Sequence, residues 1–349
     1  MNEKFLSLAE ALISKRSLSV SEYGEIVSLY NAENAEYLAS VAEAERKRVY
    51  GNKVFIRGLI EISNYCKNNC RYCGIRAGNS SCSRFRLLPD EIFACCERGY
   101  ALGFRTFVMQ GGEDGFYTDD VLVPLIDRIK NAFPDCAVTL SLGERGYESF
   151  ARLKRAGADR YLLRHETADR EHYEKLHPSA MSFENRMDSL KLLKELGYQT
   201  GAGFMVGSPY QMEETLAKDL KFIEEFAPDM CGIGPFIPHR DTPFADFPAG
   251  DAGKTCYLLS IIRIMFPNIL LPATTALASL SGDGRIRGML SGANVVMPNL
   301  SPASTREKYA LYNGKASTGI ESAEGLESLQ KQMRSIGYEI CVSRGDIIK

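Results

Sequence analysis

Residues 54–74 read VFIRGLIEISNYCKNNCRYCG and join a predicted β-strand to a cysteine motif. The first part, 54–62, is rich in β-branched and other apolar residues, which favour a strand. Directly after it, Cys66, Cys70 and Cys73 follow one another at C-x3-C-x2-C spacing. Since the carboxyl ends of parallel strands meet at one face of an α/β protein, we expect the three thiols at that face.

The three cysteines are predicted to bind a 4Fe–4S cluster. They cannot complete a four-thiolate zinc site by themselves, whereas a 4Fe–4S cluster held by three thiolates keeps one iron open to a substrate or cofactor. Lys67 and Arg71 lie between the cysteines, and their positive charge favours the thiolate forms. The alternatives are a structural zinc knuckle with a distant fourth ligand, or three unrelated cysteines.

The rest of the chain alternates short β-branched or aromatic runs with longer amphipathic segments, which is typical of α/β proteins. The best-marked helices lie at 183–193 and 216–226, where apolar residues recur at helical spacing. No linker separates the strands, so we expect a closed (β/α)8 TIM-type barrel rather than an open sheet. The eight candidate strands are 54–62, 106–110, 137–142, 160–165, 201–206, 230–234, 269–273 and 293–297.

The two ends of the chain differ from the barrel in their sequence pattern. Residues 1–49 are predicted to form an N-terminal helical extension, because Leu6, Ala9 and Leu12 repeat at helical spacing. The barrel is expected to span 50–312. The remaining stretch, 313–349, reads as a loop, a helix and a short strand, and we expect this tail to pack on the barrel.

Composition excludes several classes of protein. The chain has 349 residues, 45% of them hydrophobic, which is enough for a sizeable core. Its net charge of −2 argues against a nucleic-acid partner, and no apolar run approaches the roughly 20 residues that span a membrane. The N-terminus lacks the apolar block of a signal peptide, so we expect a cytoplasmic protein. Its ten cysteines then suggest metal binding, catalysis or burial rather than disulfides.

Polar groups gather where the second and fourth predicted strands end. Gly111 and Gly112 follow the second strand, and glycines allow a ligand to approach the backbone closely. Arg164 and Glu166 end the fourth strand, and Arg186 stands in the first turn of the helix that begins near 183. Their guanidinium and carboxylate groups suit a carboxylate and hydroxyls of a ligand. The competing interpretations are a plain turn, a structural ion pair and an exposed helix charge.

The later strands also end in residues that can bind a ligand. Two adjacent threonines at a barrel mouth can bind an anion or another polar group, although ordinary strand ends are an equal alternative. The histidine that follows the sixth strand is either catalytic or held by the backbone, and the two tyrosines after the last strand can be ordinary packing. These residues are His239, Thr274, Thr275, Met297, Tyr309 and Tyr312.

The cysteine spacing, with Tyr72 before the third cysteine, resembles the radical S-adenosylmethionine (SAM) superfamily. The resemblance implies that SAM binds the open iron and that the reduced cluster cleaves SAM to a 5′-deoxyadenosyl radical. It also implies roles for the neighbouring residues: Tyr72 against adenine, the Gly111–Gly112 backbone on the amino group, Glu166 on the ribose and Arg186 on the carboxylate.

Seven segments in order are similar to a narrower family, the FeFe-hydrogenase maturases of the HydE type, from about residue 50 to about 315. These segments are EISNYCKNNCRYCGIR, RHETAD, SFENR, LKELGYQTGAGFMVG, GIGPFIPH, PATTA and GANVVMPN. The resemblance implies work in hydrogenase H-cluster assembly with HydF and HydG, on a small iron-bound cysteine, with an electron donor such as ferredoxin or flavodoxin. It implies a substrate cavity lined by Arg164, Thr274, Thr275, Met297, Tyr309 and Tyr312.

Other functions compete with this one. A lysine mutase of the methylornithine synthase type would use the same barrel, and a non-enzymatic iron–sulfur carrier would need neither an open iron nor a polar barrel mouth. Biotin synthase is disfavoured, since Val138 and Thr200 stand where its second cluster needs cysteines. Some HydE members carry a second cysteine set after the last strand, but only Cys341 follows Tyr312 here, so we expect no second cluster there.

Overall fold

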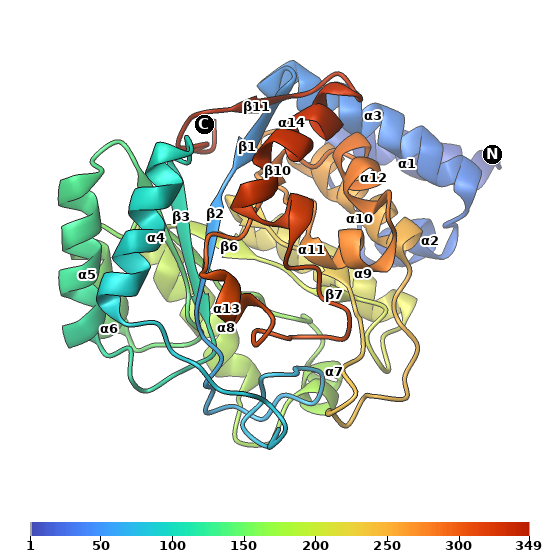
Figure 1. Cartoon of the computed structure of the whole chain (residues 1–349). Helices are drawn as coiled ribbons and strands as arrows, with labels where there is room; N and C mark the ends of the chain where they lie inside the picture. The colour runs from blue at the N-terminus through green and yellow to red at the C-terminus, as the bar shows by residue number, and fades with distance from the viewer. Residues whose placement is uncertain (1, 349) are drawn as a thin grey trace.

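A closed ring of parallel strands, with helices around it, forms the centre of the molecule (Figure 1). The computed structural model describes residues 2–348. Its strands are β1 (Lys53–Ile56), β2 (Gly58–Ser63), β3 (Thr106–Gly111), β4 (Ala137–Ser141), β5 (Arg160–Leu162), β6 (Gln199–Ala202), β7 (Met205–Val206), β8 (Met230–Cys231), β9 (Gly234–Pro235), β10 (Val295–Val296) and β11 (Glu339–Cys341).

The ring closes through a continuous series of parallel pairings. One side is the ladder β2-β3-β4-β5-β6-β8. The bridge Met230–Leu270 continues it, the bridge Pro272–Val295 follows, and β10 then pairs with β1. Residues 269–273 thus occupy the position of the predicted seventh strand, but they pair through isolated bridges and do not form a regular strand. The closed eight-stranded barrel predicted from the sequence is therefore confirmed.

Three of the predicted strands are interrupted. The segment 54–62 divides into β1 and β2, 201–206 into β6 and β7, and 230–234 into β8 and β9. Gly203 accounts for the second break: its φ is +155°, and a Cβ there would lie 2.1 Å from the carbonyl oxygen of Gly232. A side chain cannot fit between these two strands, so their backbones come together and turn toward the barrel mouth.

Helices cover the outside of the barrel, as the βα alternation predicts. Ser182 caps α8 by accepting from the Asn185 amide, and Gly197 follows that helix with φ +75°. The helices that follow β2 are α4 (Pro89–Ala101), α5 (Asp119–Ala132), α6 (Tyr147–Arg155), α7 (Arg170–Leu176), α8 (Phe183–Glu195), α9 (Glu213–Phe226), α10 (Ala252–Met265), α11 (Thr275–Leu280), α12 (Gly284–Leu290) and α13 (Ala303–Arg306).

Three helices precede the first strand: α1 (Glu3–Lys15), α2 (Val20–Ser28) and α3 (Ala32–Tyr50). They lie against the barrel helices, with α3 beside α10 and α2 beside α9. Arg46 of α3 is fully buried, and its guanidinium donates to the carbonyl oxygens of Ala293, Gly51 and Lys53. These three bonds attach the helical extension to the barrel where β1 begins.

The end of the chain closes the barrel at the end opposite the cysteine loop. After α14 (Leu326–Arg334), β11 pairs in parallel with β1 (Figure 1). Beyond β11, Arg160 inside the barrel donates to the Arg344 carbonyl and to Asp346, both at 2.7 Å. The loop, helix and strand predicted for 313–349 are present, and the segment that follows the strand lies under the barrel.

Apolar side chains fill the space between the barrel wall and its helices in one large core. A small separate cluster, with Leu176, Met205, Phe236 and Phe244 at its centre, packs against Tyr72 beside the cysteine loop. Within residues 2–348, none of the helices combines the length and the apolar character needed to cross a membrane.

Candidate functional site

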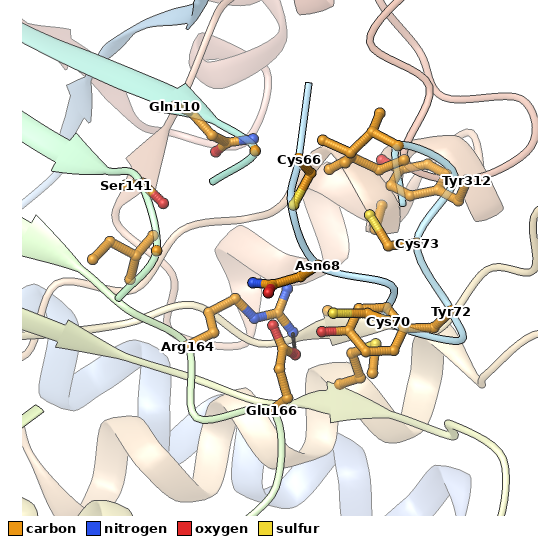
Figure 2. Close-up of a pocket in the computed structure, with 18 of the residues that line it drawn as sticks. Cys66, Asn68, Cys70, Tyr72, Cys73, Gln110, Ser141, Arg164, Glu166 and Tyr312 are labelled. Atoms are coloured by element: carbon orange, nitrogen blue, oxygen red, sulfur yellow. Dashed lines mark ion pairs between the residues drawn. The ribbon is translucent and has the colours of Figure 1, made fainter. Parts of the chain in front are cut away.

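A cavity of about 300 Å³ at the carboxyl end of the strands brings together most of the predicted site residues (Figure 2). The three cysteines lie on one side of it, and Arg164 and Glu166 face them from the end of β5 (Figure 2). The predicted residues that line this cavity are Cys66, Cys70, Tyr72, Cys73, Gly111, Gly112, Arg164, Glu166, Arg186, Thr274, Tyr309 and Tyr312.

Two residues expected in the substrate cavity, Thr275 and Met297, do not line it. The Thr275 hydroxyl lies 3.2 Å from Glu321, to which it donates, and Met297 packs against a separate cluster that contains Tyr50 and Phe55. Thr274 is the N-cap of α11 and lines the cavity, whereas Thr275 is the first residue of that helix and its side chain meets Glu321 instead. The structure therefore does not bring Thr275 and Met297 to the cavity that they were expected to line.

The cysteine loop is held in shape by two side chains that the sequence reading did not single out. Asn64 accepts from the Phe85 amide and donates to the carbonyl oxygens of Ser83 and Lys308. Arg84 donates to the carbonyl oxygens of Ile75 and Arg76. Both side chains thus bond to backbone groups far along the loop, which no local pattern reveals.

The three thiols fit the predicted iron–sulfur cluster. The Cys66 sulfur accepts from the Glu113 amide at 3.4 Å, and the Cys70 sulfur lies 3.6 Å from that of Met181. Burial raises the pKa of all three thiols, that of Cys70 to about 12, so a bound cation is needed to hold them as thiolates. Among residues 2–348, no group of three or more Cys, His, Asp or Glu side chains lies close enough together to hold a single metal ion.

The glycine pair after β3 brings its backbone directly against the cysteine loop. A Cβ on Gly112 would lie 2.2 Å from the Tyr65 carbonyl oxygen and 2.7 Å from the Cys66 Cβ. The Gly112 amide donates to the Ser63 carbonyl. Only glycine allows this approach, which keeps the backbone of 111–112 in the cavity wall beside the cysteines.

Arg164 and Glu166 form an ion pair at 3.4 Å (Figure 2). The contact joins Arg164 Nη2 to Glu166 Oε2 without a hydrogen bond: these two atoms and Arg164 Nε are buried, and none of the three makes a hydrogen bond among the described residues. Buried polar atoms without partners are costly, so these three atoms mark a place where a polar ligand fits.

Arg186 lies behind this pair and is already engaged. Its Nε donates to Glu144 at 2.6 Å, and its Nη1 donates to the Arg164 carbonyl at 2.6 Å. Burial alone would lower the Arg186 pKa, but nearby Tyr173 and Glu144 raise it. Arg186 therefore stays charged and connects the start of α8 to the end of β5.

His177, which follows α7, is a further member of the site that the sequence reading missed. Its Nδ1 lies 2.9 Å from the Tyr173 carbonyl, which only accepts, so Nδ1 carries the proton. Nε2 then accepts from the Tyr72 hydroxyl at 3.2 Å. Burial, helped by the charge of Arg186, lowers the His177 pKa to about 3 and keeps the ring neutral. No motif surrounds His177 that would have pointed to this contact.

On the far side of the cysteines, Tyr309 accepts a hydrogen bond from Gln110 at 3.4 Å. Beside it, the buried carboxylate of Glu61 accepts from Lys315 at 2.6 Å and from Asn299 at 2.8 Å. The Lys315 ammonium also lies 5.2 Å from the centre of the Tyr309 ring. Lys315 thus attaches the loop that contains Tyr312 to the inside of the barrel.

The histidine after the sixth strand and most of the other cysteines lie outside the main cavity. His239 Nδ1 accepts from the Asp241 amide at 3.1 Å, as the backbone-held interpretation predicts, and the ring lies outside the main cavity. Among the other cysteines, which the sequence assigned to metal binding, catalysis or burial, five are buried: Cys95, Cys96, Cys136, Cys231 and Cys256.

Comparison with known proteins identifies relatives that belong to the superfamily suggested by the cysteine spacing. The model of the radical SAM superfamily matches residues 60–223. The FeFe-hydrogenase maturase subunit HydE of Thermotoga maritima is 42% identical over 93% of this chain and 90% of its own length. The 3-methylornithine synthase of Methanosarcina acetivorans is 30% identical over 95% of this chain and 92% of its own.

Two solved structures have the same fold over almost the whole chain. The crystal structure of methylornithine synthase (PylB) matches with a TM-score of 0.84 at 28% identity, covering 96% of this chain and 97% of that one. The crystal structure of HydG, a maturase of the FeFe-hydrogenase, matches with a TM-score of 0.80 at 19% identity, covering 96% and 75%. The second likeness concerns the fold alone.

These relatives, together with the cysteine loop at the mouth of a closed barrel, establish the kind of protein. Radical SAM enzymes use a 4Fe–4S cluster and SAM, and three thiols in one cavity beside partnerless polar atoms fit both cofactors. The chain is an enzyme of the radical SAM superfamily and belongs, within it, to the HydE family of hydrogenase maturases.

Proposed function

We propose that this chain acts in FeFe-hydrogenase H-cluster assembly, on a small substrate in which a cysteine is bound to iron. The observation that carries the proposal is the single cavity in which three thiols face Arg164 and Thr274. The 42% identity to a HydE maturase over almost the whole chain supports the choice of reaction. When bound, the cluster and SAM supply a 5′-deoxyadenosyl radical on one-electron reduction.

In this proposal Cys66, Cys70 and Cys73 hold the cluster. Their loop places Tyr72, whose ring would lie against the adenine of SAM. Beside the cysteine loop, the carbonyl groups of Gly111 and Gly112 would accept from the SAM amino group. The close approach of Gly112 to Cys66 supports this arrangement, since it brings that backbone beside one of the residues that would hold the cluster.

Glu166 and Arg186 would bind the rest of SAM. Glu166 Oε2 is buried without a hydrogen-bond partner and suits the ribose hydroxyls. Arg186 uses Nε and Nη1 for Glu144 and Arg164, so its Nη2 is the group that would meet the SAM carboxylate. Arg186 therefore has two tasks, holding the end of β5 and binding the cofactor.

The substrate would bind through Arg164 and Thr274. Arg164 Nε and Thr274 Oγ1 are buried donors without partners among the described residues, and an anionic ligand such as an iron-bound cysteine would accept from them. Tyr309 and Tyr312 would cover its less polar part. Thr275 and Met297 have no part in this binding, because they do not line the cavity.

The proposed partners follow from the reaction. HydG and HydF would act with this chain in hydrogenase maturation, and ferredoxin or flavodoxin would supply the electron. We propose a cytoplasmic location, since these reactions need reduced thiols and a reduced cluster. The net charge of −2 agrees with the absence of a nucleic-acid partner from this proposal.

A lysine mutase is the second candidate, because methylornithine synthase shares the fold. Lysine would need a carboxylate for its side-chain ammonium. Of the acidic residues in the cavity wall, Glu113 is paired with Lys67 at 3.1 Å, and Glu166 is assigned to the ribose. Glu61 lies nearby but already pairs with Lys315. This distribution of charge favours an anionic substrate.

The two functions can be separated in one set of reactions. Reconstituted protein receives SAM and a reductant with either lysine or the iron-bound cysteine, and the products are analysed by mass spectrometry. Methylornithine in the lysine reaction would overturn the maturase proposal. Restored hydrogenase activity in a strain that lacks its own HydE would support it, with Cys70→Ala as the inactive control.

A further inference from the structure

A buried histidine–aspartate pair lies behind Glu166, outside the cavity wall. His165 lies three positions beyond the end of β5, next to Glu166, and Asp219 comes from α9, on the outside of the barrel. His165 Nε2 lies 3.4 Å from Asp219 Oδ1, and both side chains have no exposed surface. Neither residue lines the cavity, so neither can touch the cofactor or substrate directly.

The surroundings of the pair are apolar. The His165 ring lies 4.6 Å from the ring of Phe222 and 5.7 Å from that of Phe204, measured between centres. His165 Nδ1 accepts from the Gly203 amide at 3.3 Å, so the ring proton is on Nε2 and faces Asp219. Burying an aspartate among such side chains costs free energy unless its carboxylate is paired or hydrogen-bonded.

The backbone next to the histidine–aspartate pair has an unusual conformation. Glu166 has φ +65°, in the left-handed region that non-glycine residues rarely adopt. Its amide donates to the Gly203 carbonyl at 3.0 Å. Two positions later, the Ala168 amide donates to Asp219 Oδ1 at 2.5 Å. The unusual turn is therefore held at both ends: Gly203 bonds to it at Glu166, and Asp219 bonds to it at Ala168.

The left-handed turn determines where the Glu166 side chain points. With an ordinary negative φ, the Cα–Cβ bond would leave the backbone in another direction, and the carboxylate would not meet Arg164 in the cavity. A residue that holds the turn therefore also controls the position of Glu166 Oε2, the atom assigned to SAM, which lies 3.4 Å from Arg164 Nη2 but makes no hydrogen bond among the described residues.

We propose that Asp219 is a positioning residue for SAM binding. From α9 it holds the turn 165–168 by accepting from the Ala168 amide, beside the His165 ring, and so aims the Glu166 carboxylate at the ribose. This inference rests on the proposed role of Glu166 and extends it to a residue 53 positions further along the chain. A purely structural Asp219 would instead help α9 to pack, with no special effect on Glu166.

A double-mutant cycle separates these two roles. The holoenzyme is reconstituted as wild type, Asp219→Ala, Glu166→Ala and the double variant, and equilibrium SAM affinity, iron content and melting temperature are measured. Asp188→Ala on α8 is the control, because Asp188 is exposed and pairs only with exposed Lys191. It should leave SAM affinity unchanged.

We expect Asp219→Ala to weaken SAM binding roughly tenfold in the wild-type background, with iron content unchanged, and less than about twofold in the Glu166→Ala background. Equal losses in both backgrounds, or no loss in the wild type, would overturn the positioning role while leaving Glu166 assigned to SAM. If Glu166→Ala alone binds SAM normally, the assignment of Glu166 fails, and this inference fails with it.

A second variant covers the case in which Asp219→Ala does not fold. His165→Phe keeps a ring against Phe222 but loses the acceptor for the Gly203 amide and the donor that faces Asp219. It should weaken SAM binding in the wild-type background and not in the Glu166→Ala background. Additive losses in this cycle would contradict the proposal in the same way.

Discussion

The hydroxyl of Tyr72 donates to Nε2 of His177 at 3.2 Å, which ties the middle of the cysteine motif to the end of α7. The rings of the two residues meet edge to face, with centres 5.5 Å apart. Because Tyr72 lies between two of the proposed cluster ligands, this bond restrains the loop and the ring together.

Tyr72→Phe should loosen this restraint without removing the ring. The substitution removes the hydroxyl and leaves Nε2 of buried His177 without a donor, which costs about 1 kcal/mol of folding free energy. We expect a lower melting temperature, unchanged iron content and a SAM affinity reduced by less than about tenfold, because the ring is still present. Loss of the cluster in Tyr72→Phe would show that the hydroxyl has a larger role than orientation.

Cys70→Ala should prevent cluster assembly, since two thiolates do not hold a 4Fe–4S cluster stably. Iron analysis and EPR after anaerobic reconstitution measure this directly. Cys82→Ala is a matched control: Cys82 lies next to the same loop, 3.5 Å from the Asn64 side chain, but outside the cavity. Normal iron content in Cys70→Ala, or its loss in Cys82→Ala, would contradict the ligand assignment.

Glu166→Ala should weaken SAM binding roughly ten- to a hundredfold, because charged hydrogen bonds in a dry site are strong. Iron content should not change, since Glu166 lies opposite the cysteines in the cavity (Figure 2). Equilibrium binding of SAM to the reconstituted protein is the measurement. Glu174→Ala, on the exposed surface of α7, should bind SAM as the wild type does. An unchanged affinity in Glu166→Ala would mean that the carboxylate serves only its ion pair with Arg164.

The two adjacent threonines should behave differently. Thr274→Val removes a partnerless hydroxyl from the cavity, so hydrogenase maturation should fall at least about tenfold while SAM cleavage continues. Thr275→Val removes the bond to Glu321 and should lower stability by about 1 kcal/mol, with maturation retained. Complementation in a HydE-deficient strain measures the first effect and thermal unfolding the second. Equal loss of maturation in both variants would refute the opposite orientation of the two hydroxyls.

The tail under the barrel should make stability depend on pH. Burial alone would raise the Asp346 pKa, but hydrogen bonds from Arg344 and Gln199 and the charge of Arg160 lower it. Asp346 therefore stabilises the fold above its unfolded pKa of about 3.9, and this contribution is lost as pH falls through the lower folded value. The melting temperature of Asp346→Asn should lie below that of the wild type at pH 7, and the difference should shrink below about pH 4. Asp188→Asn, at an exposed ion pair, should show no such trend.

Much of this protein was predictable because it is encoded locally. The spacing of Cys66, Cys70 and Cys73 after a strand predicted the cysteine loop at the barrel mouth, and helical periodicity predicted α8 and α9. The count of strands predicted the closed barrel. The cysteine loop and each helix depend on residues within about ten positions of one another, where the chain itself fixes their relative directions.

Other features arise only when the barrel closes. His177 meets Tyr72 across 105 positions, and Asp219 meets Ala168 across 51. Lys315 reaches Glu61 across 254 positions. The opposite directions of Thr274 and Thr275 likewise depend on where α11 begins against the barrel wall. The sequence by itself therefore determined the cofactor motif and the order of strands and helices. Tertiary packing decided which polar atoms meet, because contacts between distant segments depend on the whole folded chain and not on local spacing.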